Sequence, residues 1–391
     1  MRILHVIPSV AAASGGPAQA LIPMCRELGA QQVDVLVVTT DAEMSSEATR
    51  TRTKIDYKGV PTIFFPSRWG RSFKFSNSLS TWLNQNVQEF DAVHIHAVFN
   101  HACVAAARAC RDNNVPYIIR PLGTLDPWSM RQKRFRKHLF WRLRGEEMLR
   151  SAAAVHYTTR AEQVAVEQTL RLNHGHVIPL GIDTLEGALQ SRRDELAKQL
   201  PDLNGHSYLL VLSRIHPKKG LDVLIDAFSE VTSNSCFSNW RLVIAGDGPD
   251  DYVRRLREIA VKKGATARVL FPGWVDGENK NRLLQHASIL VLTSYQENFG
   301  LCLLEAMACA VPVLVSPHVN LAEQIQNAGA GWVSRVDGGA LENALVDAFG
   351  NDKERIKRGL AGQQLSKRFT WNNTATQLVQ LYSSITSANR N

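Results

Sequence analysis

Short apolar runs rich in β-branched residues recur along the whole chain, and helical segments separate most of them. Such a run without a helical period is typical of a strand buried on both faces of a parallel sheet. In the first half of the chain the predicted strands are 2–9, 33–40, 61–66, 91–97, 116–121, 153–159 and 176–181. This alternation of strands and helices predicts a doubly wound α/β domain over residues 1–182.

The alternation starts again after a polar, charged helix and a loop. The second set of predicted strands is 208–214, 241–246, 268–274, 288–294 and 312–317. We therefore expect a second Rossmann-like α/β domain over residues 183–368. Residues 369–391 predict a terminal helix with one apolar face, formed by Ala375, Leu378, Val379 and Tyr382.

Length and composition set the outer limits of the prediction. The chain has 391 residues, of which 45% are hydrophobic, and this suits two domains that each have a core. No apolar run reaches the roughly 18 residues of a membrane-spanning helix. Residues 2–9 have the pattern of a strand and not of an export signal, so we expect a cytoplasmic or peripheral protein. The six cysteines form no Cys-x-x-Cys pair, so reduced thiols are expected.

Histidine, cysteine and acidic residues do not gather at the spacing of a metal site. The sequence therefore predicts no bound metal. His94 and His96 alternate along the strand 91–97, and we expect their side chains on opposite faces of that strand.

The most informative segment is 294–312, where two carboxylates flank a turn between a strand and a helix. Open parallel sheets bind ligands at the carboxyl ends of their strands. The turn at 298–300 begins an apolar helix whose first amides lack intrahelical partners and favour an anion. A phosphate would repel Glu297 and Glu305, so we expect them to accept hydrogen bonds from hydroxyls beside it. The alternative is two solvated glutamates, one of which helps to cap the helix.

A basic turn follows the predicted strand 208–214. It carries Arg214, Lys218 and Lys219 and ends at Gly220. Arginine can bind phosphate oxygens bidentately, and lysine contributes a point charge. The turn therefore predicts a diphosphate at the end of this strand, and an ordinary basic surface loop is the alternative.

Two glycine-rich turns also follow predicted strands. Residues 14–19 contain Gly15 and Gly16, which would let the backbone approach a ligand and present its amides. They form neither a dinucleotide fingerprint nor a P-loop. The turn 246–249 begins with Gly246. An ordinary turn is the alternative for both segments.

These segments together resemble the signature of the retaining glycosyltransferases of family 4. The resemblance rests on two glutamates separated by seven residues, with Asn-Phe-Gly after the first and Glu-Ala-Met around the second, and on Arg214 and the Lys219-Gly220 pair. It extends over nearly the whole chain. It implies the GT-B fold, in which two Rossmann-like domains face each other across a cleft and the last helix crosses back to the N-terminal domain.

The resemblance also implies roles for individual residues. Arg214 and Lys219 would neutralise the leaving diphosphate, Glu297 would contact hydroxyls of the donor sugar, and Glu305 would contact the ribose hydroxyls. The other positions that it places around the donor are Gly16, Gly246, Asn298, Phe299, Gly300 and Leu301.

Two positions depart from the family pattern. Many members have a histidine where this chain has Leu122, in the loop 121–128, so any role of that histidine must be absent or moved. Asp126, as a catalytic candidate, and His96 are the nearest candidates for contacting acceptor or donor hydroxyls, and a structural role is the alternative for each. Ala310 stands where a glycine is common, which we interpret as packing.

Residues 130–150 combine many basic side chains with aromatic and aliphatic ones. A basic amphipathic helix with aromatic residues can lie in an anionic membrane surface, here the inner face of the cytoplasmic membrane. The alternative is a solvated face whose apolar stripe packs on its own domain.

The resemblance implies a metal-independent transfer of a hexose to an oligosaccharide or a lipid-linked glycan in polysaccharide biosynthesis. UDP-glucose is the expected donor, and no further cofactor is needed. A GDP-mannose-dependent mannosyltransferase and a catalytically idle GT-B scaffold on a membrane are the alternatives. Nucleic acid is not an expected partner, because the basic residues form no recognised module.

Overall fold

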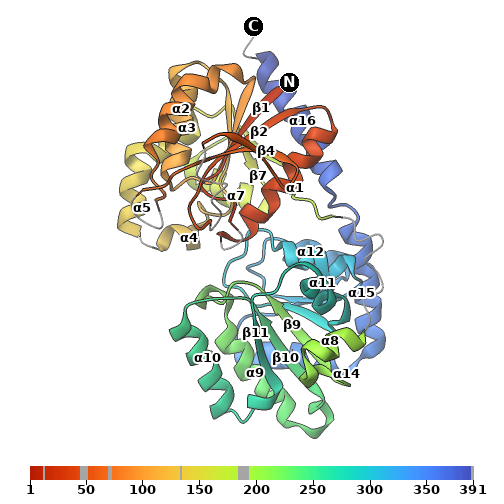
Figure 1. The fold of residues 1–391 in the computed structure, drawn as a ribbon. Coiled ribbons are helices and arrows are strands. Elements are labelled where there is room, and N and C mark those ends of the chain that lie inside the picture. The colour runs from red at the N-terminus through yellow and green to blue at the C-terminus, as the bar shows by residue number, and fades with distance from the viewer. Residues whose placement is uncertain (12–13, 45–51, 69–72, 133, 184–192, 389–391) are drawn as a thin grey trace. The chain divides into compact units, whose positions relative to one another are not determined.

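The computed structural model describes the chain except for residues 12–13, 45–51, 69–72, 133, 184–192 and 389–391. Two compact units are present, each an α/β domain (Figure 1). Unit 1 comprises Met1–Gly181 together with Thr370–Asn391, and unit 2 comprises Ile182–Phe369. The sequence places these two divisions after residues 182 and 368, one residue away in each case. The predicted α/β fold class is confirmed.

Unit 1 is built around a sheet whose described strands have the order β3-β4-β2-β1-β5-β6-β7-β8. All neighbouring strands are parallel except β3 and β4. The sequence does not predict β3, because it is a half-exposed edge strand and not a buried apolar run. The strands are β1 Arg2–Val6, β2 Asp34–Thr40, β3 Lys54–Tyr57, β4 Val60–Phe65, β5 Ala92–His96, β6 Tyr117–Arg120, β7 Ala154–Tyr157 and β8 Gly175–Val177.

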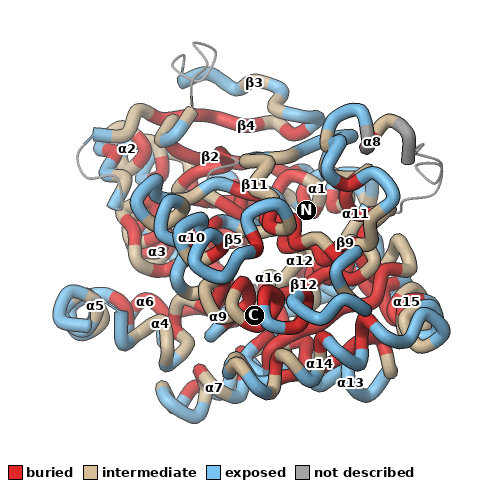
Figure 2. The backbone as a smooth tube through the Cα atoms, turned by 90° about the horizontal axis from the view of Figure 1, so that it is seen from below, coloured by how far each residue is buried: buried red, intermediate tan, exposed pale blue. Residues whose placement is uncertain are grey.

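Helices cover this sheet, and the terminal helix α16 packs against α1 and β5 within the same unit. The strands carry the buried core, whereas α5 is exposed along most of its length (Figure 2). The segment 130–150 is divided among α4, α5, a π-helical stretch over Trp141–Gly145, and α6. The helices are α1 Gly16–Ala30, α2 Asn77–Asn86, α3 His101–Asp112, α4 Pro127–Arg131, α5 Arg134–Phe140, α6 Glu146–Arg150, α7 Arg160–Leu170 and α16 Trp371–Ala388.

Unit 2 contains a parallel sheet whose described strands have the order β11-β10-β9-β12-β13-β14. The strands are β9 Ser207–Leu212, β10 Trp240–Ala245, β11 Val269–Gly273, β12 Ile289–Leu292, β13 Val313–Val315 and β14 Gly331–Val333. The sequence does not predict β14, which has only three residues. The helices are α8 Arg193–Gln199, α9 Leu221–Ser233, α10 Asp250–Lys262, α11 Gly277–His286, α12 Leu301–Ala308, α13 Ala322–Ala328, α14 Gly338–Gly350 and α15 Asp352–Ser366.

The strand order of unit 2 reverses between β9 and β12, which are neighbours in the sheet. From β9 the chain adds strands on one side through β10 and β11, and from β12 it adds them on the other side. Such a switch point opens a crevice at the carboxyl ends of its two strands. Among the described helices of both units, none is long and apolar enough to span a membrane.

Candidate functional site

The basic turn and the carboxylate-bearing turn of unit 2 both leave the sheet at the β9/β12 switch point. Hydrogen bonds join them: Thr293 Oγ1 donates to the carbonyl of Lys219 at 2.9 Å, and the amide of Tyr295 donates to the carbonyl of Lys218 at 2.8 Å. Gly220 has a φ of 62°, and a Cβ there would lie 2.6 Å from the carbonyl oxygen of Thr293. A glycine is therefore required for the two turns to approach this closely.

Lys219 and Glu297 form an ion pair across the two turns. Their Nζ and Oε2 atoms are 2.5 Å apart, and the side chains are only 14% and 20% exposed. Burial by itself would raise the pKa of Glu297. The Lys219 ammonium outweighs that effect, with help from Lys218 and the amide of Asn298, and holds the pKa of Glu297 below its usual value. Glu297 is therefore an ionised acceptor at neutral pH.

Arg214 is the exposed cation of the same turn, and it has no carboxylate partner among the described residues. The pKa of His216 reflects the positive electrostatic potential at this turn. Partial burial lowers the pKa of His216, and the positive charges of Arg214, Lys218 and Lys219 lower it further. The turn therefore presents more positive charge than Glu297 neutralises, which favours an anionic ligand.

The turn that begins at Gly246 packs directly beneath the basic turn. A Cβ on Gly246 would lie 1.9 Å from the carbonyl oxygen of Ser213, and the Ile215 amide donates to the Asp247 carbonyl at 2.7 Å. The glycine therefore allows the end of β10 to support the backbone on both sides of Arg214. This contact explains Gly246 without a ligand.

Residues 298–301 lead into α12. Gly300 is the N-cap and has a φ of 73°, in the left-handed region that favours glycine. The Phe299 side chain is buried and contacts Phe369 at a ring-centroid distance of 6.0 Å, so only its backbone is left for a ligand. Asn298 accepts a hydrogen bond from Asn320 at 3.3 Å, and Leu301 is the first residue of the helix.

Glu305 lies one helical turn further along α12. Its carboxylate is 2.6 Å from Nζ of Lys280, which projects from α11. About a quarter of each side chain is exposed, so the carboxylate keeps access to solvent. The helix α12 thus carries a paired but accessible acceptor at Glu305, and the turn before the helix carries another at Glu297.

Sequence reasoning missed three residues of this region. Lys280 is one, and the others are His318 and Asn320, which follow β13: the His318 carbonyl accepts from the Glu297 amide, and the Asn320 amide donates to the Glu297 carbonyl, both at 3.0 Å. The signal for His318 and Asn320 was present, because they follow the carboxyl end of a strand next to β12. Lys280 had no comparable signal, because it lies inside a helix and does not follow the end of a strand.

Gly16 and Asp126 lie in unit 1. Gly16 begins α1 after β1, but Gly15 is the residue with the left-handed φ, at 83°. A Cβ on Gly16 would find no atom within 4 Å, so this position is open. Asp126 is the N-cap of α4, and its carboxylate accepts from the Trp128 amide at 2.8 Å. That bond supports the structural alternative for Asp126.

The two departures from the family pattern both lie at positive φ. Leu122 has a φ of 60°, and the next residue, Gly123, is held by a hydrogen bond from its amide to the buried carboxylate of Glu162 at 2.7 Å. Ala310 has a φ of 56°. The interpretation of Ala310 as packing is therefore wrong, because a left-handed backbone is what favours a glycine there.

The expectation for His94 and His96 is also wrong. Side chains two residues apart on a strand share one face, and both rings are buried with their centroids 4.3 Å apart. With His5 they form a group whose nitrogens lie within 4.8 Å of one another, which is the one set in the described residues with the geometry to hold a metal ion. His96 is therefore a core residue and not an exposed contact.

Hydrogen bonds in this cluster favour a polar network over a metal centre. The Tyr382 hydroxyl lies 2.7 Å from His94 Nδ1, His94 Nε2 lies 3.3 Å from His156 Nδ1, and His156 Nε2 lies 2.8 Å from the Ile178 carbonyl. The carbonyl can only accept, so the chain runs in one direction with every histidine neutral. Both nitrogens of His94 are then in use. Arg120 is fully buried beside His96 and would repel a cation.

Two family models match the chain. Residues 192–364 match the model described as glycosyl transferases group 1, and residues 14–185 match glycosyltransferase family 4. The D-inositol 3-phosphate glycosyltransferase of Corynebacterium efficiens is 31% identical over 45% of this chain and 42% of that protein. The mannosylfructose-phosphate synthase of Agrobacterium fabrum is 24% identical over 96% of this chain and 87% of that protein. The chain spans about half the length of the first curated relatives it matches.

Solved structures of the same fold cover nearly the whole chain. The sucrose-phosphate synthase of Thermosynechococcus elongatus has a TM-score of 0.77 at 19% identity and covers 99% of both chains. HepE of Anabaena, in complex with UDP and glucose, has a TM-score of 0.77 at 21% identity, covering 98% of this chain and all of its own. These structures have the GT-B pair of Rossmann-like domains. Because the two family models match residues 14–185 and 192–364, the chain belongs to the glycosyltransferases of family 4.

Proposed function

We propose that the protein transfers a hexose, glucose before other sugars, from a UDP-sugar to an oligosaccharide or lipid-linked glycan in polysaccharide biosynthesis. The transfer would retain the anomeric configuration and need no metal ion. The observation that carries this proposal is the ion pair of Lys219 and Glu297 at the β9/β12 switch point, beside the unneutralised charge of Arg214. A ligand with a negative diphosphate and a hydroxyl-rich sugar would match both charges.

The proposed mechanism assigns the cations to the leaving group. Negative charge grows on the departing diphosphate in the transition state, and Arg214, Lys219 and the first amides of α12 would stabilise it electrostatically. Glu297 remains ionised and accepts from sugar hydroxyls, while Glu305 accepts from the ribose. Lys219 also fixes the position of Glu297, so one ammonium would serve the sugar and the diphosphate together.

The comparisons favour one donor over another. HepE of Anabaena is seen with UDP-glucose, which favours a UDP-hexose. A matched relative from Mycobacterium leprae is a phosphatidyl-myo-inositol mannosyltransferase, which keeps a GDP-mannose donor as the second candidate. An idle scaffold is disfavoured, because a protein without a donor has no need for the largely buried Lys219–Glu297 pair at a switch point.

A thermal-shift panel with UDP-glucose, GDP-mannose and ADP-glucose in the presence of a chelator tests the donor. A ligand at 100 times its Kd stabilises the native state by roughly 2.7 kcal/mol. We expect UDP-glucose to give the largest shift. Glu305→Ala should weaken donor binding by about 2 kcal/mol, because it removes a charged hydrogen-bond acceptor. Glu323→Ala, an exposed glutamate on α13, is the matched control.

The panel has outcomes that contradict the proposal. A shift with none of the three donors would remove the transferase function, and a larger shift with GDP-mannose would favour the mannosyltransferase. An equal loss in Glu305→Ala and Glu323→Ala would remove the ribose role of Glu305. Retention is read separately, from the anomer of the sugar that is first released when the enzyme hydrolyses its donor.

The segment formed by α5 and the π-helical stretch after it supports membrane attachment. Phe135, Leu139 and Leu143 recur every four residues and are 85%, 62% and 59% exposed. They do not pack on their own domain, whereas Phe140 and Trp141 do. Basic residues flank the exposed stripe at Arg134, Arg136, Lys137, Arg142 and Arg144. We propose that this stripe enters an anionic membrane surface and brings the enzyme to a lipid-linked acceptor.

Vesicle co-sedimentation tests the membrane proposal. Binding to vesicles with phosphatidylserine should exceed binding to neutral vesicles at least tenfold, and salt should weaken it, because each basic residue contributes about 1 kcal/mol near an anionic surface. Leu139→Gln/Leu143→Gln should lose most of the binding. Ile356→Gln/Leu360→Gln, an equally spaced exposed pair on α15, is the control. Equal binding to neutral and anionic vesicles would contradict the proposal.

A further inference from the structure

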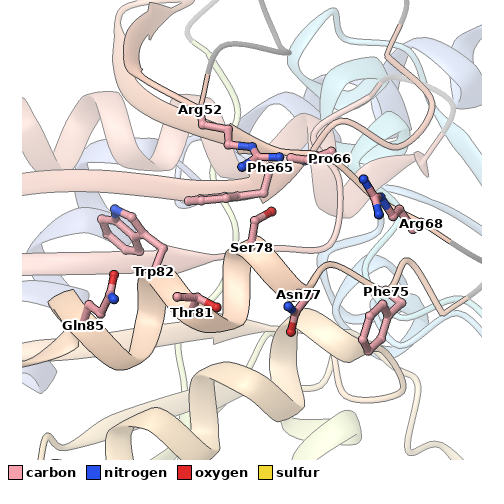
Figure 3. A pocket seen from close by; sticks show the side chains of 10 residues that line it. All are labelled: Arg52, Phe65, Pro66, Arg68, Phe75, Asn77, Ser78, Thr81, Trp82 and Gln85. Carbon is pink, nitrogen blue, oxygen red and sulfur yellow. The ribbon is translucent and has the colours of Figure 1, made fainter.

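Unit 1 contains a hollow between the end of β4 and one face of α2 (Figure 3). Its volume is about 780 Å³. Phe65 and Pro66 line one side at the carboxyl end of β4, and the residues of α2 that line the other side recur at helical spacing from Asn77 to Gln85. The carboxyl edge of a parallel sheet is where ligands bind, so this hollow has the location of a ligand site.

The lining combines aromatic rings with side-chain amides. Phe65 is buried and its ring is 5.9 Å from that of half-buried Trp82, so the floor is a fixed aromatic surface. Asn77 and Gln85 stand exposed on the same helix face, and Phe75 closes the far end. A sugar ring has an apolar face and a hydroxyl-bearing edge. Aromatic rings can cover the apolar face of the sugar, and amides can both donate hydrogen bonds to its hydroxyls and accept hydrogen bonds from them.

The described side chains on the rim of the hollow carry positive charge. Arg52 and Arg68 both line it, and neither forms an ion pair with any described residue. Among the residues that the structure describes, no aspartate or glutamate lines the hollow. The carboxylates of Asp41 and Glu43 are engaged outside it, by Ser67 and by Lys74 respectively. A guanidinium without a carboxylate favours an anionic ligand, which it can grip bidentately.

Hydrogen bonds connect this hollow to the glycine turn after β1. Arg68 pairs with Phe75 across a short bridge, and Lys74 in the same segment donates to Ser14 Oγ at 3.1 Å and pairs with Glu43 at 3.0 Å. Ser14 immediately precedes Gly15 and Gly16. The strands β4 and β1 are separated only by β2, which places the hollow on the order of 10 Å from the β1 end of the sheet.

We propose that this hollow is a subsite for an anionic sugar unit of the acceptor glycan. The unit would stack on Trp82 and Phe65, and Arg52 and Arg68 would bind its carboxylate or phosphate. The description as an acceptor subsite rests on the proposed function. The binding of an anionic sugar does not.

Ligand-observed NMR with the full-length protein, saturated with UDP, tests the subsite. The probes are glucuronic acid, glucose 6-phosphate and glucose. We expect the anionic sugars to bind at least tenfold more tightly than glucose at low salt. The stronger of the two anionic probes identifies the carboxylate or the phosphate as the recognised group. The preference should fall to about one in Arg52→Gln/Arg68→Gln.

The control is Arg254→Gln/Arg255→Gln, which removes two arginine charges from α10 in unit 2. It should keep the preference for anionic sugars. The proposal is overturned if the three sugars bind alike to the wild type, or if Arg52→Gln/Arg68→Gln keeps the preference. Donor hydrolysis by Arg52→Gln/Arg68→Gln should equal that of the wild type. If anionic sugars bind but no donor does, the transferase function fails while the subsite stands.

Discussion

Replacing Lys219 by alanine should lower the turnover number by about 10² to 10³, because one preorganised charge that meets the transition state is worth that much in other enzymes. The loss should fall mainly on kcat and less on donor affinity, since the diphosphate gains charge only as the bond breaks. Glu297 should also change. Burial remains when the ammonium is gone, so its pKa should rise, and residual activity should increase with pH as Glu297 ionises.

Lys218→Ala is the matched control, because it removes the same charge from the same turn without the 2.5 Å contact to Glu297. We expect Lys218→Ala to lower the turnover number less than about tenfold. Lys219→Arg should recover part of the activity but not all, since a guanidinium cannot replace a point charge at this distance. Initial rates of donor hydrolysis over a pH series measure all three variants. Wild-type turnover in Lys219→Ala, or an equal loss in Lys218→Ala, would contradict the role of Lys219.

The core strands and the approximate location of the candidate site could be predicted from the sequence. Buried runs such as 208–214 and 288–294 carry a clear apolar pattern, and the rule that ligands bind at carboxyl ends then selects the turns after them. The rule finds Arg214, Lys219 and Glu297 because each lies in the turn that follows a strand. Asp126 shows the limit of such reasoning, because a motif position cannot distinguish a carboxylate that meets a ligand from one that caps a helix.

Other features depend on tertiary contacts that no local pattern encodes. The hollow of unit 1 unites the end of β4 with a helix face that begins twelve residues later in the chain. The buried histidines come from three strands, β1, β5 and β7, and meet a tyrosine from the C-terminal helix. A histidine in an apolar run indicates only that the residue is buried. Which polar groups it meets follows from the strand order.

The histidine network makes unit 1 sensitive to acid. His5, His94, His96 and His156 are fully buried, and burial is the main reason why their pKa values are low. The positive charge of Arg120 lowers all four further. For His5 and His156 the pKa falls from 6.5 to about 3. In the one-way chain of hydrogen bonds, His94 Nδ1 accepts from the Tyr382 hydroxyl, and His94 Nε2 donates to His156 Nδ1. A proton added to His94 Nδ1 would therefore break its hydrogen bond with Tyr382.

Unit 1 should therefore lose most of its stability between pH 6.5 and pH 4. Well above pH 6.5 these histidines are neutral in both the native and the unfolded state, so they do not lower the free energy of unfolding. Below it the unfolded chain takes up protons that the native state cannot, so the free energy of unfolding falls until the pH reaches the native pKa values. At pH 4.5, His5 and His156 together account for roughly 5 kcal/mol, at 1.36 kcal/mol per pKa unit. This is comparable with the whole stability of a domain.

Urea unfolding from pH 7.5 to pH 4.5 measures this effect, with hydrogen exchange of β5 and α16 reporting on unit 1. Between pH 5 and pH 6 the slope should exceed 2.7 kcal/mol per pH unit, which corresponds to the uptake of more than about two protons. His156→Gln should reduce that slope by the amount that corresponds to the uptake of about one proton, even if the variant is also less stable at pH 7.5. His138→Gln removes an exposed histidine of α5 and should leave the slope unchanged. A slope below one proton in the wild type would show that the cluster accepts charge without unfolding, and the one-way network would then be the wrong description of it.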